Sequence, residues 1–201
     1  MTKKKNIIVL VLVFVLLIGG ASVLYTQLGK TDTPDQLLIQ DESDNSEDES
    51  NTTDTDETDQ QDQQLTKAPD FAVIDASGNK VRLSDYIGKP IVLNFWASWC
   101  GPCQSEMPDF HEKYLEHGEE IHFLMVNMTG GRETLSKAKA FISDKEYTFP
   151  VFFDTDFDAA TTYSVYSLPT TYFINAEGYI VAQASGAITA DSLQRGIDMI
   201  K

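Results

Sequence analysis

Cysteine is scarce in this chain: the 201 residues contain only two, Cys100 and Cys103. Two cysteines separated by two residues cannot provide the several cross-links of a disulfide-stabilised scaffold. A structural zinc site is also disfavoured, because it needs two further ligands and the histidines at positions 111, 117 and 122 do not follow a ligand spacing. We therefore expect no metal ion and no other cofactor.

Basic residues are also few, with 15 Lys and Arg against 31 Asp and Glu and a formal net charge of −16. A nucleic-acid-binding domain carries a basic patch, so nucleic acid is not expected as a partner. The acidic charge is unevenly distributed, because residues 31–66 contain 13 of the acidic residues and no Lys or Arg. From residue 67 onward there are 18 acidic and 11 basic residues, which is typical of a soluble, self-repelling domain.

Only residues 1–30 contain an apolar run long enough for a membrane. Three lysines at 3–5 precede 24 uncharged residues at 6–29, and Lys30 closes the run. The stretch 7–25 alone approaches the roughly 20 residues that cross a hydrocarbon core. We predict a single-pass anchor in the cell membrane, with the lysines in the cytoplasm and the following residues on the extracytoplasmic side. A cleaved signal peptide is the alternative, although Gly19-Gly20-Ala21 is a poor cleavage site.

Residues 31–67 are predicted to be an acidic, disordered linker. Between residues 41 and 64 there is no aromatic and no aliphatic side chain. Such a segment buries too little apolar surface to offset the entropy of ordering. The simplest function is a tether that holds a domain away from a membrane, and an acidic tail that binds a partner is the alternative.

Residues 68–201 form the only predicted globular domain. The expected elements are a hairpin over 71–83, strands at 91–96, 121–126, 151–153, 170–174 and 179–184, and helices at 101–116, 133–143, 156–163 and 190–200. The first of these helices should end near Gly118, a plausible left-handed glycine after the last turn. Strands that alternate with helices before a closing hairpin predict an α/β fold with a mixed central sheet and helices on both faces.

The two cysteines lie in Trp96-Ala97-Ser98-Trp99-Cys100-Gly101-Pro102-Cys103, where a buried strand should end and a helix should begin. Unpaired N–H groups and the helix dipole at such a position favour a thiolate. The thiolate is the attacking species in thiol–disulfide exchange. This placement indicates a redox-active dithiol. A fixed structural disulfide is the alternative, although so small a ring gains little chain entropy.

Further short motifs accompany the cysteine pair across residues 68–201. They are Pro69-Asp70-Phe71, Leu83-Ser84-Asp85-Tyr86, Gly88-Lys89-Pro90, Leu93-Asn94-Phe95, Glu106-Met107-Pro108, Leu168-Pro169-Thr170-Thr171 and Asn175-Ala176-Glu177-Gly178. Together they resemble the thioredoxin-like proteins, and within them the extracytoplasmic, membrane-anchored TlpA/ResA group of thiol–disulfide oxidoreductases. The resemblance implies a thioredoxin-like fold with an N-terminal β-hairpin extension.

The resemblance also implies roles for individual cysteines and for their neighbours. Cys100 corresponds to the more exposed, attacking thiol, and Cys103 to the thiol that resolves the mixed disulfide. Pro169 corresponds to a cis-proline that faces the thiols, so Leu168 and Pro169 are expected to bind the client backbone; an ordinary trans turn is the alternative. Trp99 corresponds to the aromatic residue beside the thiols, with a plain core aromatic as its alternative.

Glu106 corresponds to an acid that assists proton transfer near the thiols in the TlpA/ResA group. The alternative is a solvated carboxylate on the surface of the helix. Thioredoxin itself has a buried Asp in the strand where this chain has Asn94, which cannot titrate. That difference is typical of the membrane-tethered group, and it places the acid–base role on Glu106.

The Gly101-Pro102 pair between the cysteines is that of thioredoxin, a reductant. We therefore predict a monomeric protein-disulfide reductase that acts on extracytoplasmic partner proteins, for example in cytochrome c biogenesis. The family implies a membrane-embedded dithiol donor that returns electrons to it. A disulfide-forming oxidase and a metal- or haem-handling chaperone are the alternatives. A peroxiredoxin is disfavoured, because it needs a lone peroxidatic cysteine supported by Thr and Arg.

Overall fold

The computed structural model describes residues 37–39 and 65–201. The predicted membrane segment at 1–30 and the acid-rich residues 41–64 lie outside these ranges. Among the described residues, no helix has both the length and the apolar character needed to cross a membrane.

Four buried strands form the centre of the sheet. The strand β5 (Ile91–Trp96) lies between β6 (His122–Asn127), which runs parallel to it, and β8 (Thr170–Ile174), which runs antiparallel. The strand β7 (Val151–Phe153) continues the sheet in parallel with β6. All six residues of β5 are buried, because helices cover both faces of the sheet at this point. The predicted mixed sheet is confirmed.

Hairpins complete the sheet on both sides. Next to β7 lie β3 (Ala72–Ile74) and β4 (Lys80–Arg82), which form the predicted N-terminal hairpin and lead into the 3₁₀ turn η1 (Leu83–Tyr86). Next to β8 lies β9 (Tyr179–Ser185), the partner expected for the closing hairpin. The order of the strands in the described residues is β1-β9-β8-β5-β6-β7-β3-β4, with β2 also paired to β9.

Two short strands were not predicted, and both come from the range assigned to the linker. The strand β1 (Leu37–Ile39) and the strand β2 (Thr66–Lys67) each pair antiparallel with β9. Leu37 lies opposite Ala184, and Thr66 lies opposite Ile180. The outer edge of β9 is therefore covered by two segments of the chain that precede the globular domain.

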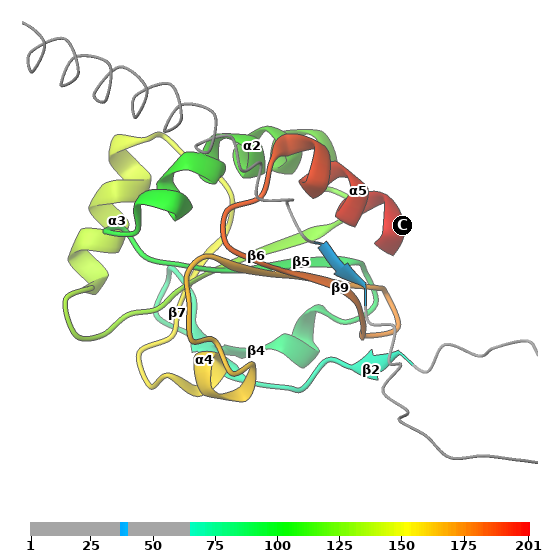
Figure 1. The fold of residues 1–201 in the computed structure, drawn as a ribbon. Helices are drawn as coiled ribbons and strands as arrows, with labels where there is room; N and C mark the ends of the chain where they lie inside the picture. The colour runs from blue at the N-terminus through cyan, green and yellow to red at the C-terminus, as the bar shows by residue number, and fades with distance from the viewer. Residues whose placement is uncertain (1–36, 40–64) are drawn as a thin grey trace, which may run out of the picture. The chain divides into compact units, whose positions relative to one another are not determined.

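The helices are α2 (Gly101–His117), α3 (Leu135–Asp144), α4 (Asp158–Thr162) and α5 (Ala190–Ile200). Figure 1 shows α2, α3 and α5 on one face of the sheet and α4 on the opposite face. The structure confirms the four predicted helices, although α4 is shorter than the range 156–163 and β6 begins one residue later than expected.

The apolar core is divided by the sheet into two clusters. The first contains Met107 of α2, Ala138 of α3 and Leu193 of α5, together with one face of the central strands. The second contains Leu83 of η1 and Ala159 of α4, together with the other face. Because the first cluster packs α2 firmly onto the sheet, the N-terminus of α2 is held at the end of β5.

Gly118 ends α2 in a different way from the one predicted. A glycine after the last helical turn usually has a left-handed backbone, but Gly118 has φ −64° and ψ −13°, which is right-handed. A Cβ atom at this position would lie 2.6 Å from the carbonyl oxygen of Tyr114 and 2.8 Å from its ring. Glycine is therefore required here by the close approach of Tyr114, not by the backbone conformation.

Candidate active site

The cysteine pair lies at the junction of β5 and α2, as predicted. After β5 ends at Trp96, three residues lead to Cys100, which has an extended backbone and forms the N-cap of α2. Cys100 and Cys103 are joined by a disulfide, with their Cα atoms 5.3 Å apart. A buried strand and a packed helix therefore fix the positions of both sulfur atoms.

The two sulfur atoms differ in their access to solvent and in their local electrostatics. Cys103 is fully buried, whereas Cys100 retains 4% of its surface and lines a cavity. The backbone N–H of Cys103 donates a hydrogen bond to Sγ of Cys100 at 3.2 Å. In the reduced protein this N–H and the helix dipole stabilise a thiolate at Cys100. Of the two sulfur atoms, that of Cys100 belongs to the residue that lines the cavity, while the roles of Cys100 in attack and of Cys103 in resolution stay predictions.

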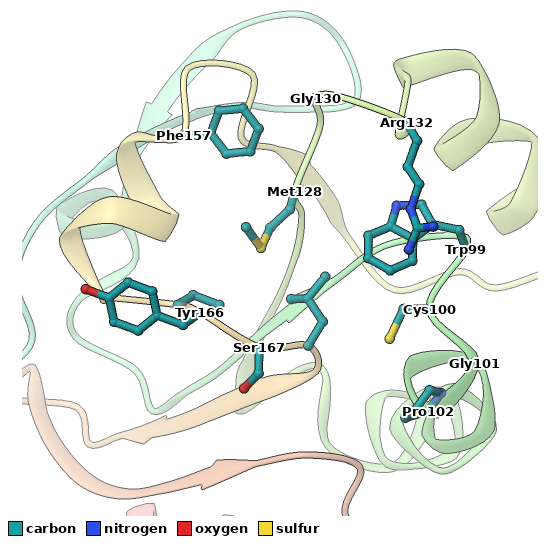
Figure 2. Close-up of a pocket in the computed structure, with 12 residues that line it drawn as sticks. Trp99, Cys100, Gly101, Pro102, Met128, Gly130, Arg132, Phe157, Tyr166 and Ser167 are labelled. Atoms are coloured by element: carbon teal, nitrogen blue, oxygen red, sulfur yellow. The ribbon is translucent and has the colours of Figure 1, made fainter.

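The cavity beside Cys100 has a volume of about 430 Å³. It is bounded by the start of α2, the loop after β6, the N-cap of α4 and the segment before β8. Its lining consists of Trp99, Cys100, Gly101, Pro102, Met128, Gly130, Arg132, Phe157, Val165, Tyr166, Ser167 and Leu168. Figure 2 shows the sulfur of Cys100 pointing into this space. The cavity is mostly apolar and opens to solvent, so it can receive a side chain next to a client disulfide.

The peptide bond between Leu168 and Pro169 is cis, as predicted. Leu168 lines the cavity, whereas Pro169 is not among its lining residues. The carbonyl oxygen of Pro169 accepts a hydrogen bond from the N–H of Gly186 at 2.9 Å, which ties this segment to the end of β9. The structure therefore brings Leu168 to the cavity of Cys100, while a contact of either residue with a client stays a prediction.

Trp99 is not a core aromatic residue. Its side chain is 45% exposed and lines the cavity. The guanidinium carbon of Arg132 lies 3.6 Å from the centroid of its ring (Figure 2). Sequence reasoning missed Arg132, because nothing in its spacing connects the loop after β6 with the cysteine pair.

Glu106 is buried, with only 2% of its surface exposed, so the alternative of a solvated carboxylate is wrong. Its Oε1 accepts a hydrogen bond from Nδ2 of Asn94 at 2.9 Å, and its Oε2 accepts one from the backbone N–H of Ile188 at 3.0 Å. Nδ2 of Asn94 also donates to Oγ1 of Thr171. Glu106 lies one turn after Cys103 on α2, so the two side chains share a face of the helix.

A second buried carboxylate, that of Glu133, holds the segment before Cys100. Its two oxygens accept hydrogen bonds from the N–H and the hydroxyl of Ser98. The carboxylate also accepts a hydrogen bond from the N–H of Thr134. Nε2 of Gln104 donates to the carbonyl oxygen of Ser98 at 2.6 Å. Glu133 was predicted only as the start of a helix, whereas α3 begins two residues later. It is a positioning residue for the loop that leads to Cys100.

No group of three or more His, Cys, Asp and Glu side chains suited to a metal ion occurs in the described part of the chain. Nε2 of His111 instead forms hydrogen bonds with Thr148, one with the hydroxyl at 3.0 Å and one with the backbone N–H at 3.3 Å. Its ring also packs edge-on against those of Tyr147 and Phe149. This histidine fixes the start of the segment that leads into β7.

The disulfide between Cys100 and Cys103 lies at the start of a helix in a mixed sheet, and Leu168 of the cis peptide lines the same cavity as Cys100. These features define a thioredoxin-like thiol–disulfide oxidoreductase. The family model described as AhpC/TSA matches residues 65–183, and the chain belongs to this family. It is 38% identical over 135 residues to the thiol-disulfide oxidoreductase ResA of Geobacillus kaustophilus, an alignment that covers 67% of this chain and 76% of that protein.

Solved structures agree with this assignment. The pneumococcal exposed lipoprotein thioredoxin Etrx1 of Streptococcus pneumoniae is 34% identical with a TM-score of 0.57, and the match covers 65% of this chain and 99% of that one. StoA of Bacillus subtilis is 26% identical with a TM-score of 0.57, over 64% of this chain and 96% of that one. The predicted fold, family resemblance and enzyme class are confirmed, and the protein is a protein-disulfide oxidoreductase.

Proposed function

We propose that this protein is a membrane-tethered, monomeric reductase that cleaves disulfides of partner proteins on the extracytoplasmic side. The observation that carries the proposal is the asymmetry of the cysteine pair. Cys100 opens into a cavity and has an N–H directed at its sulfur, while Cys103 is sealed beneath it. A fixed structural disulfide has no need of a cavity at one sulfur, whereas an exchange reaction needs access for the client.

The reaction starts when the Cys100 thiolate attacks one sulfur of the client disulfide. The client S–S bond breaks, its second sulfur leaves as a thiolate and takes a proton, and a mixed disulfide joins the client to Cys100. Cys103 then loses its proton and attacks Cys100, which releases the first client sulfur. The client gains two electrons and two protons, and the protein becomes the disulfide form seen here. A dithiol donor in the membrane would supply the electrons that reduce it again.

The backbone of Leu168 supports binding of an extended client segment. Within the described ranges, neither its N–H nor its carbonyl oxygen forms a hydrogen bond with the rest of the chain. Both groups belong to a residue that lines the cavity of Cys100. A client strand that pairs with Leu168 would hold its own disulfide near Sγ of Cys100, because strand addition satisfies both backbone groups at once.

The cellular location is proposed from the sequence and from one relative. Lysines 3–5 and the apolar run that follows them fit an anchor with the folded domain outside the cytoplasm. Etrx1, a related domain, is described as an exposed lipoprotein thioredoxin, which supports this location. Because Leu37–Ile39 already pair with β9, the tether between the anchor and the sheet would be residues 31–36.

The direction of electron flow is tested by the reduction potential of the Cys100–Cys103 pair in the full chain. We expect a value below about −200 mV, in the range of thioredoxin and glutaredoxins. It is measured by equilibration with glutathione or dithiothreitol buffers, together with the rate of insulin reduction above that of dithiothreitol alone. A potential near the roughly −120 mV of strong oxidants would favour the oxidase. No acceleration of insulin reduction would contradict the proposal.

Replacing Glu106 by Gln is expected to slow the resolving step at least ~10-fold, because a general base contributes about 10²–10⁴-fold to a proton transfer. The carboxylate lies one turn from Cys103 and is the group placed to take its proton. Decay of a preformed mixed disulfide between pH 6 and 9 measures the step. Glu112 carries an exposed carboxylate on the same helix, so Glu112→Gln is the matched control and should behave as the wild type. Equal decay rates for both variants at every pH would remove Glu106 from the mechanism.

A further inference from the structure

Phe157 forms one wall of the cavity, and close packing against neighbouring residues holds it in place. Phe157 is the N-cap of α4 and has a left-handed backbone, with φ 56° and ψ 26°. Its ring lies against Gly130, where a Cβ atom would come within 2.2 Å of a ring carbon. The N–H groups of Ala159 and Ala160 donate to the buried carboxylate of Asp154, which fixes the first turn of α4. A bulky residue in this uncommon conformation, with a glycine reserved for its ring, indicates a shaped subsite.

Arg132 is the single charged residue among the twelve that line the cavity. Its guanidinium lies over the exposed ring of Trp99, and it forms no ion pair with any described residue. The adjacent carboxylate of Glu133 is buried and already accepts hydrogen bonds from Ser98 and Thr134. The N–H groups on the edge of the guanidinium therefore remain available to a ligand beside Cys100.

The local charge at the cavity is opposite to that of the domain as a whole. From residue 67 onward the chain has 18 acidic and 11 basic residues, which would repel an acidic client at long range. Charges on exposed groups are screened over about 8 Å at physiological ionic strength, so the group at the site decides the preference once a client is bound. The ring of Trp99 holds the guanidinium of Arg132 in place. A planar guanidinium suits a carboxylate, because it can bind both carboxylate oxygens through two N–H groups.

We propose that Arg132 selects client disulfides that carry an acidic residue within two positions of the cysteine attacked by Cys100. The carboxylate binds the guanidinium on Trp99, while an apolar neighbour of the client cysteine occupies the space against Phe157. This inference names the client class of the same site, and it rests on the proposed reductase function. Arg132 acts in specificity, and the exchange chemistry stays with Cys100 and Cys103.

Three peptide disulfides that differ at one position test the proposal. Each peptide has Phe next to its cysteine, and Glu, Gln or Lys two residues away. The pre-reduced full chain, kept in a mild detergent because of its apolar N-terminal run, reduces each peptide in a single turnover. Dithiothreitol reduces the same peptides and gives their intrinsic reactivities. Relative to dithiothreitol, the wild type is expected to prefer the Glu peptide over the Gln peptide by about fivefold, the upper range for a solvent-accessible ion pair.

Substitutions of Arg132 complete the test. Arg132→Gln is expected to lower the Glu-to-Gln rate ratio to that of dithiothreitol, and Arg132→Glu to make the Lys peptide the preferred one. Arg195→Gln removes the same charge from α5, where Arg195 contacts Ser192, and should retain the wild-type ratio. The preference of the wild type should also weaken as salt is raised.

Two results would overturn the inference. The wild-type ratio could match that of dithiothreitol, or the preference for Glu could persist in Arg132→Gln. In either case, reduction of all three peptides would leave the reductase function standing. If none of the peptides is reduced, both the inference and the proposed function fail.

Discussion

Replacing Cys103 by Ser is expected to turn the protein into a trap for its clients. Cys100 remains at the N-terminus of α2, with the N–H of residue 103 directed at its sulfur, so it still attacks client disulfides. The buried resolving thiol is missing, so the mixed disulfide persists. Catalytic turnover should fall to the background rate of the reductant alone, because each protein molecule reacts only once.

The covalent adducts of Cys103→Ser and of its control, Cys100→Ser, are detected by intact-mass measurement under non-reducing conditions. In cells, Cys103→Ser should accumulate covalent adducts that disappear on treatment with dithiothreitol, and the trapped proteins identify the clients. Cys100→Ser should form almost no adducts, because the remaining thiol is fully buried. Equal trapping by the two variants would mean that access to the sulfur does not decide which cysteine attacks, and the assigned roles would be wrong.

Replacing Gly196 by Ala is expected to destabilise the fold strongly, although it adds only a methyl group. Gly196 lies in α5 directly over Phe173 of β8, and a Cβ atom would come within 2.2 Å of two atoms of that buried ring. Overpacking of this kind costs about 1–3 kcal/mol, and the better helix propensity of Ala returns at most about 1 kcal/mol. A ring packed on both sides has little room to move, so we expect a net loss of about 2 kcal/mol.

Thermal or urea unfolding of the full chain measures this loss, which corresponds to a decrease in Tm of roughly 5–10 °C for a domain of this size. Gly101→Ala is the control, because a Cβ atom at Gly101 meets no atom within 4 Å. That variant should unfold at the wild-type temperature or slightly above it. If Gly196→Ala were as stable as the control, α5 would not pack on β8 as closely as described.

The strand–helix junction was predictable because its signals are local. A continuous apolar run precedes the cysteines, a helical pattern follows them, and both β5 and α2 form where those patterns place them. The short strands β1 and β2 have no such signal, because two or three residues cannot show a period. Their pairing depends on an edge of β9 that exists only after the sheet has formed. Gly118 illustrates the same limit, since the atoms that require a glycine belong to Tyr114.

The residues of the site also fall into those that local motifs indicate and those that only the tertiary fold brings together. The short motifs that carry the resemblance pointed to the cysteines, Pro169 and Glu106. The resemblance did not show that Glu106 is buried and accepts hydrogen bonds from Asn94 and Ile188. Arg132 and Phe157 reach the cavity from loops about 30 and 60 residues away from the cysteines. Only the tertiary fold brings them together, so no spacing rule in the sequence could reveal them.

The arrangement of Arg132 and Glu133 has a consequence for redesign. Arg132 lies over Trp99 and lines the cavity, whereas the next residue, Glu133, accepts the hydrogen bonds that hold Ser98. A backbone shift that retunes client choice at Arg132 would therefore be transmitted to the peptide units that orient the nucleophile. Phe157 accepts none of the hydrogen bonds that hold Ser98, although its ring packs on Gly130, whose carbonyl oxygen accepts a hydrogen bond from the N–H of Glu133. An engineer who wishes to change selectivity without loss of reactivity should vary Phe157 first, with substitutions that keep its packing on Gly130.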